Sequence, residues 1–225
     1  MSYSILYYTA NRPQKELADY VRECIDESRE PSSQTVCVTH SRIGWGNVEI
    51  VRGTDVVCGL ADQYDQILVG LEACEHDTVF LAEDDVLYPP GHFAWRANGR
   101  YVLSYNYSMA RMNKDGFWLD PRMIDSGCCG QRQCIKDAAQ FKKGQSDQGE
   151  RIRWSELGSE SPQARNAERH NTPIPFIDVR WGGNLTGYRE ARPGYYLDKL
   201  PHWGNHTTLA HAMGLKEIGN TQDKE

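Results

Sequence analysis

The sequence predicts an α/β fold with a mixed, mostly parallel sheet flanked by helices in a single domain. In the first 90 residues, short segments rich in β-branched and aromatic residues alternate with amphipathic helical segments. The order strand–helix–strand favours parallel strands joined by a crossover helix. A chain of 225 residues with 39% hydrophobic and 25% charged residues is large and apolar enough for one globular domain.

The first half contains the elements that define this fold class. Apolar segments predict strands over residues 4–9, 35–39, 48–51 and 78–82. Apolar residues at spacings of three and four predict a helix after residue 12 and another over 60–73. Pro13 fits the first position of the earlier helix, and Pro31 ends it.

The second half is less regular. Strands are predicted over 101–105, 116–119 and 174–179, with a tight turn over 126–130 that leads into a helix over about 131–141. Residues 142–173 are polar and predict a long loop, which is usually functional in a compact domain. We expect one domain over 1–215, with halves over 1–90 and 91–215, followed by a flexible tail over 216–225.

Composition argues against several classes of protein. No apolar segment approaches the roughly 20 residues that span a bilayer, and the N-terminal sequence lacks the features of a signal peptide, so we expect a cytoplasmic protein without membrane contacts. The chain has seven cysteines, and an odd number disfavours a disulfide framework. Cys128, Cys129 and Cys134 could suggest zinc, but they lack paired Cys-x2-Cys spacing and a nearby histidine.

Charge is unevenly distributed along the chain. Residues 1–85 contain 6 basic and 16 acidic residues, whereas residues 86–203 contain 17 and 12. A basic second half in a chain of net charge −6 indicates either an anionic partner on that side or an ordinary charged surface.

Three consecutive acids follow a buried strand. Glu83, Asp84 and Asp85 come directly after the apolar residues 79–82. In an open α/β sheet, ligands bind beyond the carboxyl ends of the strands. Crowded carboxylates repel one another unless a cation offsets their charge, and Mg²⁺ or Mn²⁺ prefers oxygen ligands together with substrate phosphates. The cluster therefore predicts a metal site for a diphosphate ligand, although a solvated acidic turn would have the same composition.

The segment Phe80-Leu81-Ala82-Glu83-Asp84-Asp85-Val86-Leu87-Tyr88-Pro89 resembles the acidic DxD-type motif of GT-A glycosyltransferases, in a Glu-Asp-Asp variant. The segment from Gln63 to Glu72 is similar to the helix before that motif, and Thr9-Ala10-Asn11-Arg12 is similar to the first nucleotide-binding loop. The resemblance covers residues 4–90. It implies that residues 1–90 are the nucleotide-sugar-binding half and residues 91–215 the acceptor half. It implies a GT-A-like, Rossmann-like fold and a nucleotide-diphosphate sugar donor, most simply a UDP-sugar, used with Mn²⁺ or Mg²⁺.

The resemblance also implies roles for individual residues. Asp85 would bind the metal, and Glu83 and Asp84 would contact ribose or metal-bound water. The residues that would flank the base and ribose are Thr9, Asn11, Arg12 and His40, although the family often has an acidic residue at the last of these positions. The segment Leu200-Pro201-His202-Trp203-Gly204 is similar to the part of some members that supplies a late histidine ligand, which makes His202 the second metal candidate.

An inverting transferase needs a carboxylate that accepts the proton of the acceptor hydroxyl. Asp178 follows a predicted strand and precedes a glycine pair that would let a substrate approach. Asp125 precedes the predicted glycine-containing turn. Both residues are candidates, and either could instead be a turn acid or an ion-pair partner.

The acceptor is less clearly indicated. Small glycosyltransferases of this kind occur in phages, where they modify hydroxymethylated pyrimidines in DNA. Arg151, Arg153, Arg165 and Arg169 could contact phosphates of such an acceptor. A surface glycan or a protein hydroxyl is the alternative.

Three other functions fit part of the sequence. A nucleotidyltransferase would also use acidic metal ligands, but it should carry a glycine-rich loop after the first strand. Residues 9–13, which follow that strand here, contain no glycine. A metal-dependent nuclease could use Glu83 and Asp85 without any nucleotide-sugar. A non-catalytic binding module would bind its ligand unchanged after Asp85→Ala.

Overall fold

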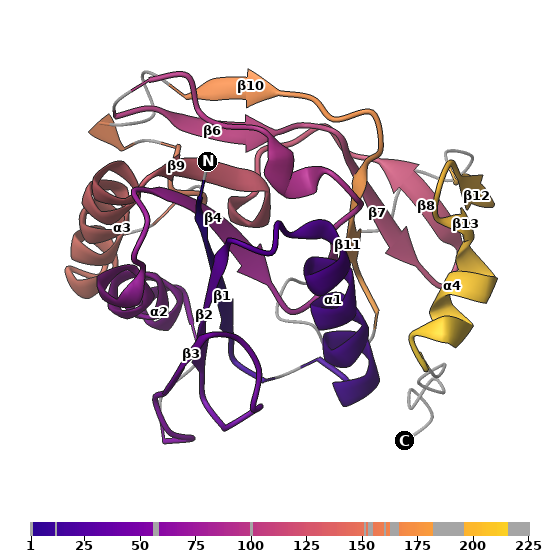
Figure 1. Ribbon diagram of the computed structural model, residues 1–225, viewed down its shortest axis with the longest axis horizontal. Helices are drawn as coiled ribbons and strands as arrows, with labels where there is room; N and C mark the ends of the chain where they lie inside the picture. The colour runs from indigo at the N-terminus through magenta and orange to yellow at the C-terminus, as the bar shows by residue number, and fades with distance from the viewer. Residues whose placement is uncertain are drawn as a thin grey trace.

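The computed structural model describes residues 2–11, 13–55, 59–99, 101–150, 152, 155–159, 161–162, 167–181 and 196–215. Figure 1 shows a large sheet with helices on both faces and a smaller sheet beside it. The predicted mixed α/β fold in a single domain is confirmed.

The main sheet has seven strands in the order β10-β6-β9-β4-β1-β2-β3 within the described part of the chain. Neighbouring strands are parallel except at β9, which is antiparallel to both β4 and β6. The strands are β1 (Ser4–Thr9), β2 (Gln34–Thr39), β3 (Val48–Val51), β4 (Thr78–Glu83), β6 (Leu103–Asn106), β9 (Cys128–Gln131) and β10 (Glu168–His170).

Alternating side chains of β1 build two cores, one on each face of the sheet. Ile5 and Tyr7, together with Tyr3 directly before the strand, pack with α1 (Lys15–Ser28) on one face. Leu6 and Tyr8 pack on the other face with the paired helices α2 (Leu60–Ala73) and α3 (Arg132–Asp147) (Figure 1). Every residue of β1 is therefore buried, as a central parallel strand requires.

The smaller sheet has the order β5-β11-β7-β8 and shares the α1-side core. Its strands are β5 (Val86–Leu87), β11 (Phe176–Val179), β7 (Met109–Asn113) and β8 (Gly116–Leu119). A hairpin of β12 (Lys199–Leu200) and β13 (Gly204–Asn205) leads into α4 (His206–Ala212) beside β8 (Figure 1). Two single turns, η1 (His92–Ala94) and η2 (Asp125–Gly127), complete the described elements.

Several predicted boundaries were wrong. Pro13 does not open α1, because the helix begins at Lys15 with Gln14 as its N-cap. The turn predicted over 126–130 is shorter and begins earlier, at Asp125–Gly127. Cys128–Gln131 is a strand. Helix α3 continues to Asp147 and Glu168–His170 forms strand β10, so the predicted loop over 142–173 was wrong at both ends.

The six described cysteines are buried and free, including Cys128, Cys129 and Cys134. No helix in the described residues is long and apolar enough to cross a membrane. The predicted tail over 216–225 lies outside the described residues.

The order of strands creates a switch point between β1 and β4. The chain moves from β1 outwards to β2 and β3, then crosses through α2 and enters β4 on the opposite side of β1. Loops at the carboxyl ends of such strands diverge and leave a crevice for ligands. Thr9 ends β1 and Glu83 ends β4, so the acidic cluster lies at this crevice.

Candidate active site

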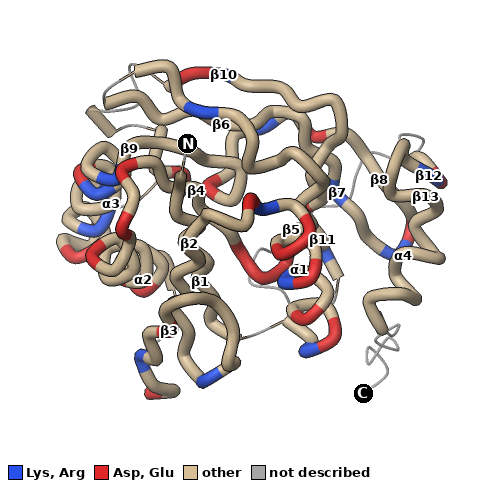
Figure 2. Tube along the Cα trace, in the orientation of Figure 1, with Lys and Arg blue, Asp and Glu red and all other residues tan. Residues whose placement is uncertain are grey.

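The three consecutive acids lie in the turn between β4 and β5. Glu83 is the last residue of β4, and Asp84 and Asp85 form the turn before Val86. Figure 2 shows consecutive acidic residues, in red, between these strands. Strand β5 belongs to the smaller sheet, so the turn also joins the two sheets.

Two of the acids are held by side chains from β1. The hydroxyl of Tyr8 donates to Glu83 Oε1 at 2.7 Å, and the hydroxyl of Thr9 donates to Asp84. Among the described residues, no side chain donates a hydrogen bond to Asp85, which is half-buried. Asp85 therefore has a carboxylate available to a ligand.

Burial and mutual repulsion raise the pKa of all three acids. Burial is the largest cause in each case. Asp178 and Glu83 further raise the pKa of Asp85, while Asp85 raises that of Asp84. Asp125 and Asp178 raise the pKa of Glu83. Five carboxyl groups thus influence one another at the end of β4, and a bound cation would relieve this repulsion.

A cavity of about 310 Å³ opens beside the acids. Its walls come from the end of β1, the start of α2 and the β4–β5 turn, with Ser155 from the second half. This volume falls at the lower end of ligand pockets in proteins. The polar lining residues are Thr9, Asp62, Gln63, Gln66, Glu83, Asp84, Asp85 and Ser155, with the Tyr8 side chain among them.

A second cavity, of about 320 Å³, shares Thr9 and Asp84 in its wall. It contains basic side chains from α1 and the loop after β2, namely Lys15, Arg22 and Arg42, together with Asn11. The Thr9–Asp84 hydrogen bond therefore lies between an acidic cavity and a mixed-charge cavity.

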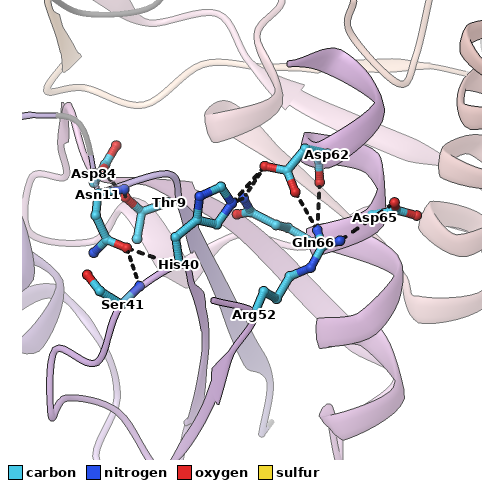
Figure 3. A network of polar contacts seen from close by, with 9 residues as sticks. All are labelled: Thr9, Asn11, His40, Ser41, Arg52, Asp62, Asp65, Gln66 and Asp84. Carbon is cyan, nitrogen blue, oxygen red and sulfur yellow. Dashed lines mark hydrogen bonds and ion pairs between the residues drawn. The ribbon is translucent and has the colours of Figure 1, made fainter. Parts of the chain in front are cut away.

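Asn11 connects the ends of β1 and β2. Its backbone has a positive φ of 54°, and its Oδ1 accepts hydrogen bonds from the backbone N–H groups of His40 and Ser41, each at 2.9 Å (Figure 3). The backbone N–H of Asn11 in turn donates to Thr9 Oγ1 at 2.7 Å. The side chain of Asn11 fixes the loop rather than pointing freely into solvent.

His40 lies outside the acidic cavity and contacts two residues that line it, Asp62 and Gln66. Its Nε2 lies 2.8 Å from Asp62 Oδ2, and Gln66 Nε2 donates to the same oxygen at 2.9 Å (Figure 3). Arg52 donates to Asp62 Oδ1 at 2.6 Å. Asp62 and Gln66 line the cavity, whereas His40 does not, so His40 acts through them.

Asp178 lies near the acids but is held by arginines. Its Oδ2 is 3.1 Å from Arg111 Nε and also receives Arg180 Nη2. Arg111 Nε is 3.2 Å from Asp120 Oδ2, and Arg122 pairs with Asp120 as well. These five residues form a ladder of alternating charge across the smaller sheet. Asp178 is 1% exposed.

Asp125 is also close to the acids, because η2 packs against β4, and its charge raises the pKa of Glu83. Its Oδ1 accepts the backbone N–H of Leu157 at 2.9 Å, and the hydroxyl of Tyr105 lies 3.5 Å away. Burial raises the pKa of Asp125 to about 7, while the Leu157 hydrogen bond acts in the opposite direction.

Asp125→Asn should stabilise the protein in a pH-dependent way. A carboxyl whose pKa is higher in the folded chain contributes stability below its ordinary pKa of 3.8, and this contribution is lost as the pH rises through about 7. Asparagine keeps the acceptor oxygen and cannot ionise. We expect the melting temperature of the variant, relative to the wild type, to rise by several degrees between about pH 5 and about pH 8. A difference that does not change with pH would contradict the burial of an ionisable Asp125.

The remaining predicted residues are not all brought together. His202 has a positive φ of 71° in the exposed β12–β13 turn, where its ring packs edge-on against Trp203 at 4.9 Å between centroids. Figure 1 shows this hairpin at the far side of β8 from β1. Arg12 lies outside the described residues. His202 as a metal ligand stays a prediction.

The network of Asp62, Gln66 and Arg52 and the ladder around Arg111 were missed by the sequence analysis. One signal was present in each case. Asp62 and Gln66 are polar residues spaced by four on the buried face of a predicted helix. Arg111 is a charged residue at the centre of a short apolar segment.

No protein-family model and no curated protein matches the chain. TarS of S. aureus aligns over 80% of this chain and 37% of its own length, with 8% identity and a TM-score of 0.48. A candidate nucleotide-diphospho-sugar transferase of Desulfovibrio desulfuricans G20 aligns over 80% of this chain and 84% of its own, with 10% identity and a TM-score of 0.39.

Proposed function

We propose that this protein is a metal-dependent glycosyltransferase that moves a sugar from a nucleotide-diphosphate sugar to an acceptor hydroxyl. The observation that carries the proposal is the position of Glu83, Asp84 and Asp85 beside a cavity at the switch point between β1 and β4. This arrangement matches the GT-A resemblance of residues 4–90.

Asp85 is the candidate metal ligand. No group of three or more histidine, cysteine, aspartate and glutamate side chains in the described ranges is arranged to hold a metal ion. Mg²⁺ and Mn²⁺ sites on nucleotide ligands need only one or two carboxylates, because phosphates and waters complete the shell. Asp85 fits this role because Tyr8 and Thr9 hold the other two acids. A bound metal would offset the charge of the leaving nucleoside diphosphate.

The neutral polar groups of the cavity suit the nucleoside part of the donor. Thr9, Gln63 and Gln66 provide hydroxyl and amide groups, and Ala10 and Leu60 provide apolar surface. Ligand pockets typically combine such surface with a few polar groups that fix orientation. We assign the donor to this cavity, with a UDP-sugar as the first candidate.

The acceptor is proposed to be a hydroxymethylated pyrimidine in DNA. Of the four arginines that suggest it, Arg169 is described, and its guanidinium lies 4.4 Å above the ring centroid of Tyr107. Such a surface could contact a phosphate or an exposed base. Transfer of labelled sugar to hydroxymethylated DNA, and not to unmodified DNA, would support this acceptor.

The donor assignment predicts a metal-dependent thermal shift. UDP or one UDP-sugar at millimolar concentration with Mn²⁺ should raise the melting temperature of the wild type by several degrees, because a ligand of the native state stabilises it. Asp85→Asn should lose this shift. Glu23→Gln, which neutralises an exposed acid on α1, should keep it.

Three results are informative. A shift with one nucleotide-sugar that disappears in Asp85→Asn supports the transferase and names the donor. A shift that persists in Asp85→Asn contradicts the assignment of Asp85 as the metal-binding residue. The absence of any shift with nucleoside diphosphates or their sugars contradicts the assignment of a donor site and favours a nuclease or a binding module.

A further inference from the structure

A short segment of the second half, residues 155–159, is inserted among buried side chains next to the acids. Loops normally run over the surface because their backbone groups need water or other partners. Here Leu157 and Gly158 are buried, and Leu157 packs in the core between the sheet and the helices α2 and α3. Ser155 lines the cavity that contains Asp85.

Side chains from four different elements anchor this segment. The Tyr64 hydroxyl (α2) donates to the carbonyl of residue 155 at 2.9 Å. Asp125 Oδ1 (η2) accepts from the N–H of residue 157 at 2.9 Å. The Tyr105 oxygen (β6) accepts from the N–H of residue 158 at 2.6 Å. Lys142 Nζ (α3) lies 3.2 Å from the hydroxyl of residue 159.

These anchoring side chains are almost completely removed from solvent. Tyr64, Tyr105 and Lys142 are 0% exposed and Asp125 is 4% exposed. Burying a lysine and an aspartate is costly unless both are satisfied. The backbone also approaches closely, since a Cβ at Gly158 would lie 2.6 Å from Tyr105 Cε2. Burying these polar groups costs free energy, and the segment that they hold reaches the cavity. This cost indicates that the position of residues 155–159 is important for the cavity.

We propose that residues 155–159 form a fixed wall of the donor cavity and that Tyr64, Tyr105 and Asp125 are positioning residues for this wall. The inference rests on the proposed function, because it assigns Ser155 to contact with the nucleotide-sugar. It gives Asp125 the role of holding a backbone N–H rather than of accepting a proton from the acceptor.

Matched Tyr→Phe variants test the wall. Tyr105→Phe leaves the N–H of Gly158 without its acceptor, and Tyr64→Phe frees the carbonyl of Ser155. Tyr3→Phe is the control, because the Tyr3 oxygen also accepts a backbone N–H, that of Glu30 at 2.9 Å, and its side chain is equally buried. The readouts are UDP affinity with Mn²⁺ by calorimetry and hydrogen exchange of the Leu157 and Gly158 amides.

We expect Tyr105→Phe and Tyr64→Phe to weaken UDP binding about five- to tenfold, the effect of losing one hydrogen bond. Tyr105→Phe should also accelerate exchange of the Gly158 amide. Tyr3→Phe should lower the melting temperature to a similar extent and leave both readouts unchanged. Equal UDP affinity in all three variants would overturn the inference, as would unprotected Leu157 and Gly158 amides in the wild type.

Asp125 separates positioning from proton transfer. Asp125→Asn keeps an acceptor oxygen for Leu157, so UDP affinity and the exchange rate of the Leu157 amide should stay within about threefold of the wild type, whereas Asp125→Ala should weaken UDP binding about tenfold. Loss of transfer in Asp125→Asn with UDP binding intact would restore the base and overturn the positioning role. If the wild type binds no nucleoside diphosphate but protects the Leu157 and Gly158 amides, the proposed function fails and the anchoring of the segment is retained.

Discussion

Arg111→Met should destabilise the protein by about 3–5 kcal/mol, which is the usual result of removing one partner from a buried ion pair. Arg111 Nε lies 3.1 Å from Asp178 and 3.2 Å from Asp120, and both aspartates are less than one-tenth exposed. The variant keeps an unbranched apolar side chain and removes the guanidinium with its charge and N–H donors. Denaturant unfolding at neutral pH measures the loss.

Lys143→Met is the control for this prediction. Lys143 pairs with Asp147 at 2.8 Å and with Asp65 of α2 at 3.5 Å, and these aspartate side chains are 53% and 35% exposed. Exposed pairs of this kind contribute roughly 0.3–0.5 kcal/mol. If the two methionine variants lost equal stability, the ladder across the smaller sheet would be no more important than a surface ion pair.

Gly70→Ala should cost about 1–3 kcal/mol through overpacking. Gly70 is the point at which α2 approaches the sheet, and a Cβ there would meet Leu6 Cδ1 at less than normal contact distance and Val38 Cγ2 at 2.9 Å. Leu6 and Val38 are 0% exposed, so neither side chain can move into open space. A fall in melting temperature with native secondary structure retained is the expected result.

Gly144→Ala on α3 is the matched comparison. A Cβ at Gly144 would have no atom within 4 Å, and alanine in a helix interior is favoured over glycine by about 0.5–1 kcal/mol. The same substitution should therefore stabilise one helix and destabilise the other. Stabilisation at both positions would show that α2 can shift away from β1 at little cost.

The sequence predicted the elements whose residues carry their own pattern. The segments 4–9 and 78–82 are strands because nearly every side chain is apolar or β-branched, and Leu60–Ala73 is a helix with an apolar face. The position of Glu83, Asp84 and Asp85 at a strand end followed from the same pattern. These features depend on neighbouring residues in the chain and so are visible without tertiary contacts.

The missed elements depend on distant partners. Strand β7 contains Arg111, whose charge breaks the apolar pattern and is accommodated by Asp178 and Asp120. Strand β9 begins with two cysteines and a glycine, which have little strand preference and are held by β4 and β6 on either side. The extension of α3 past Phe141 includes a buried lysine, which no local rule would place in a core.

Strand β9 lies between β4 and β6, although it is synthesised after both. Until residue 131 has left the ribosome, β4 lacks its final partner on one edge, and β6 lacks its partners on both edges, because β10 follows later still. Unpaired edges of this kind recruit strands from other chains. A chain of the first 90 residues would keep the β4 edge without its partner, so it should aggregate during biosynthesis, even though it contains the complete acidic motif.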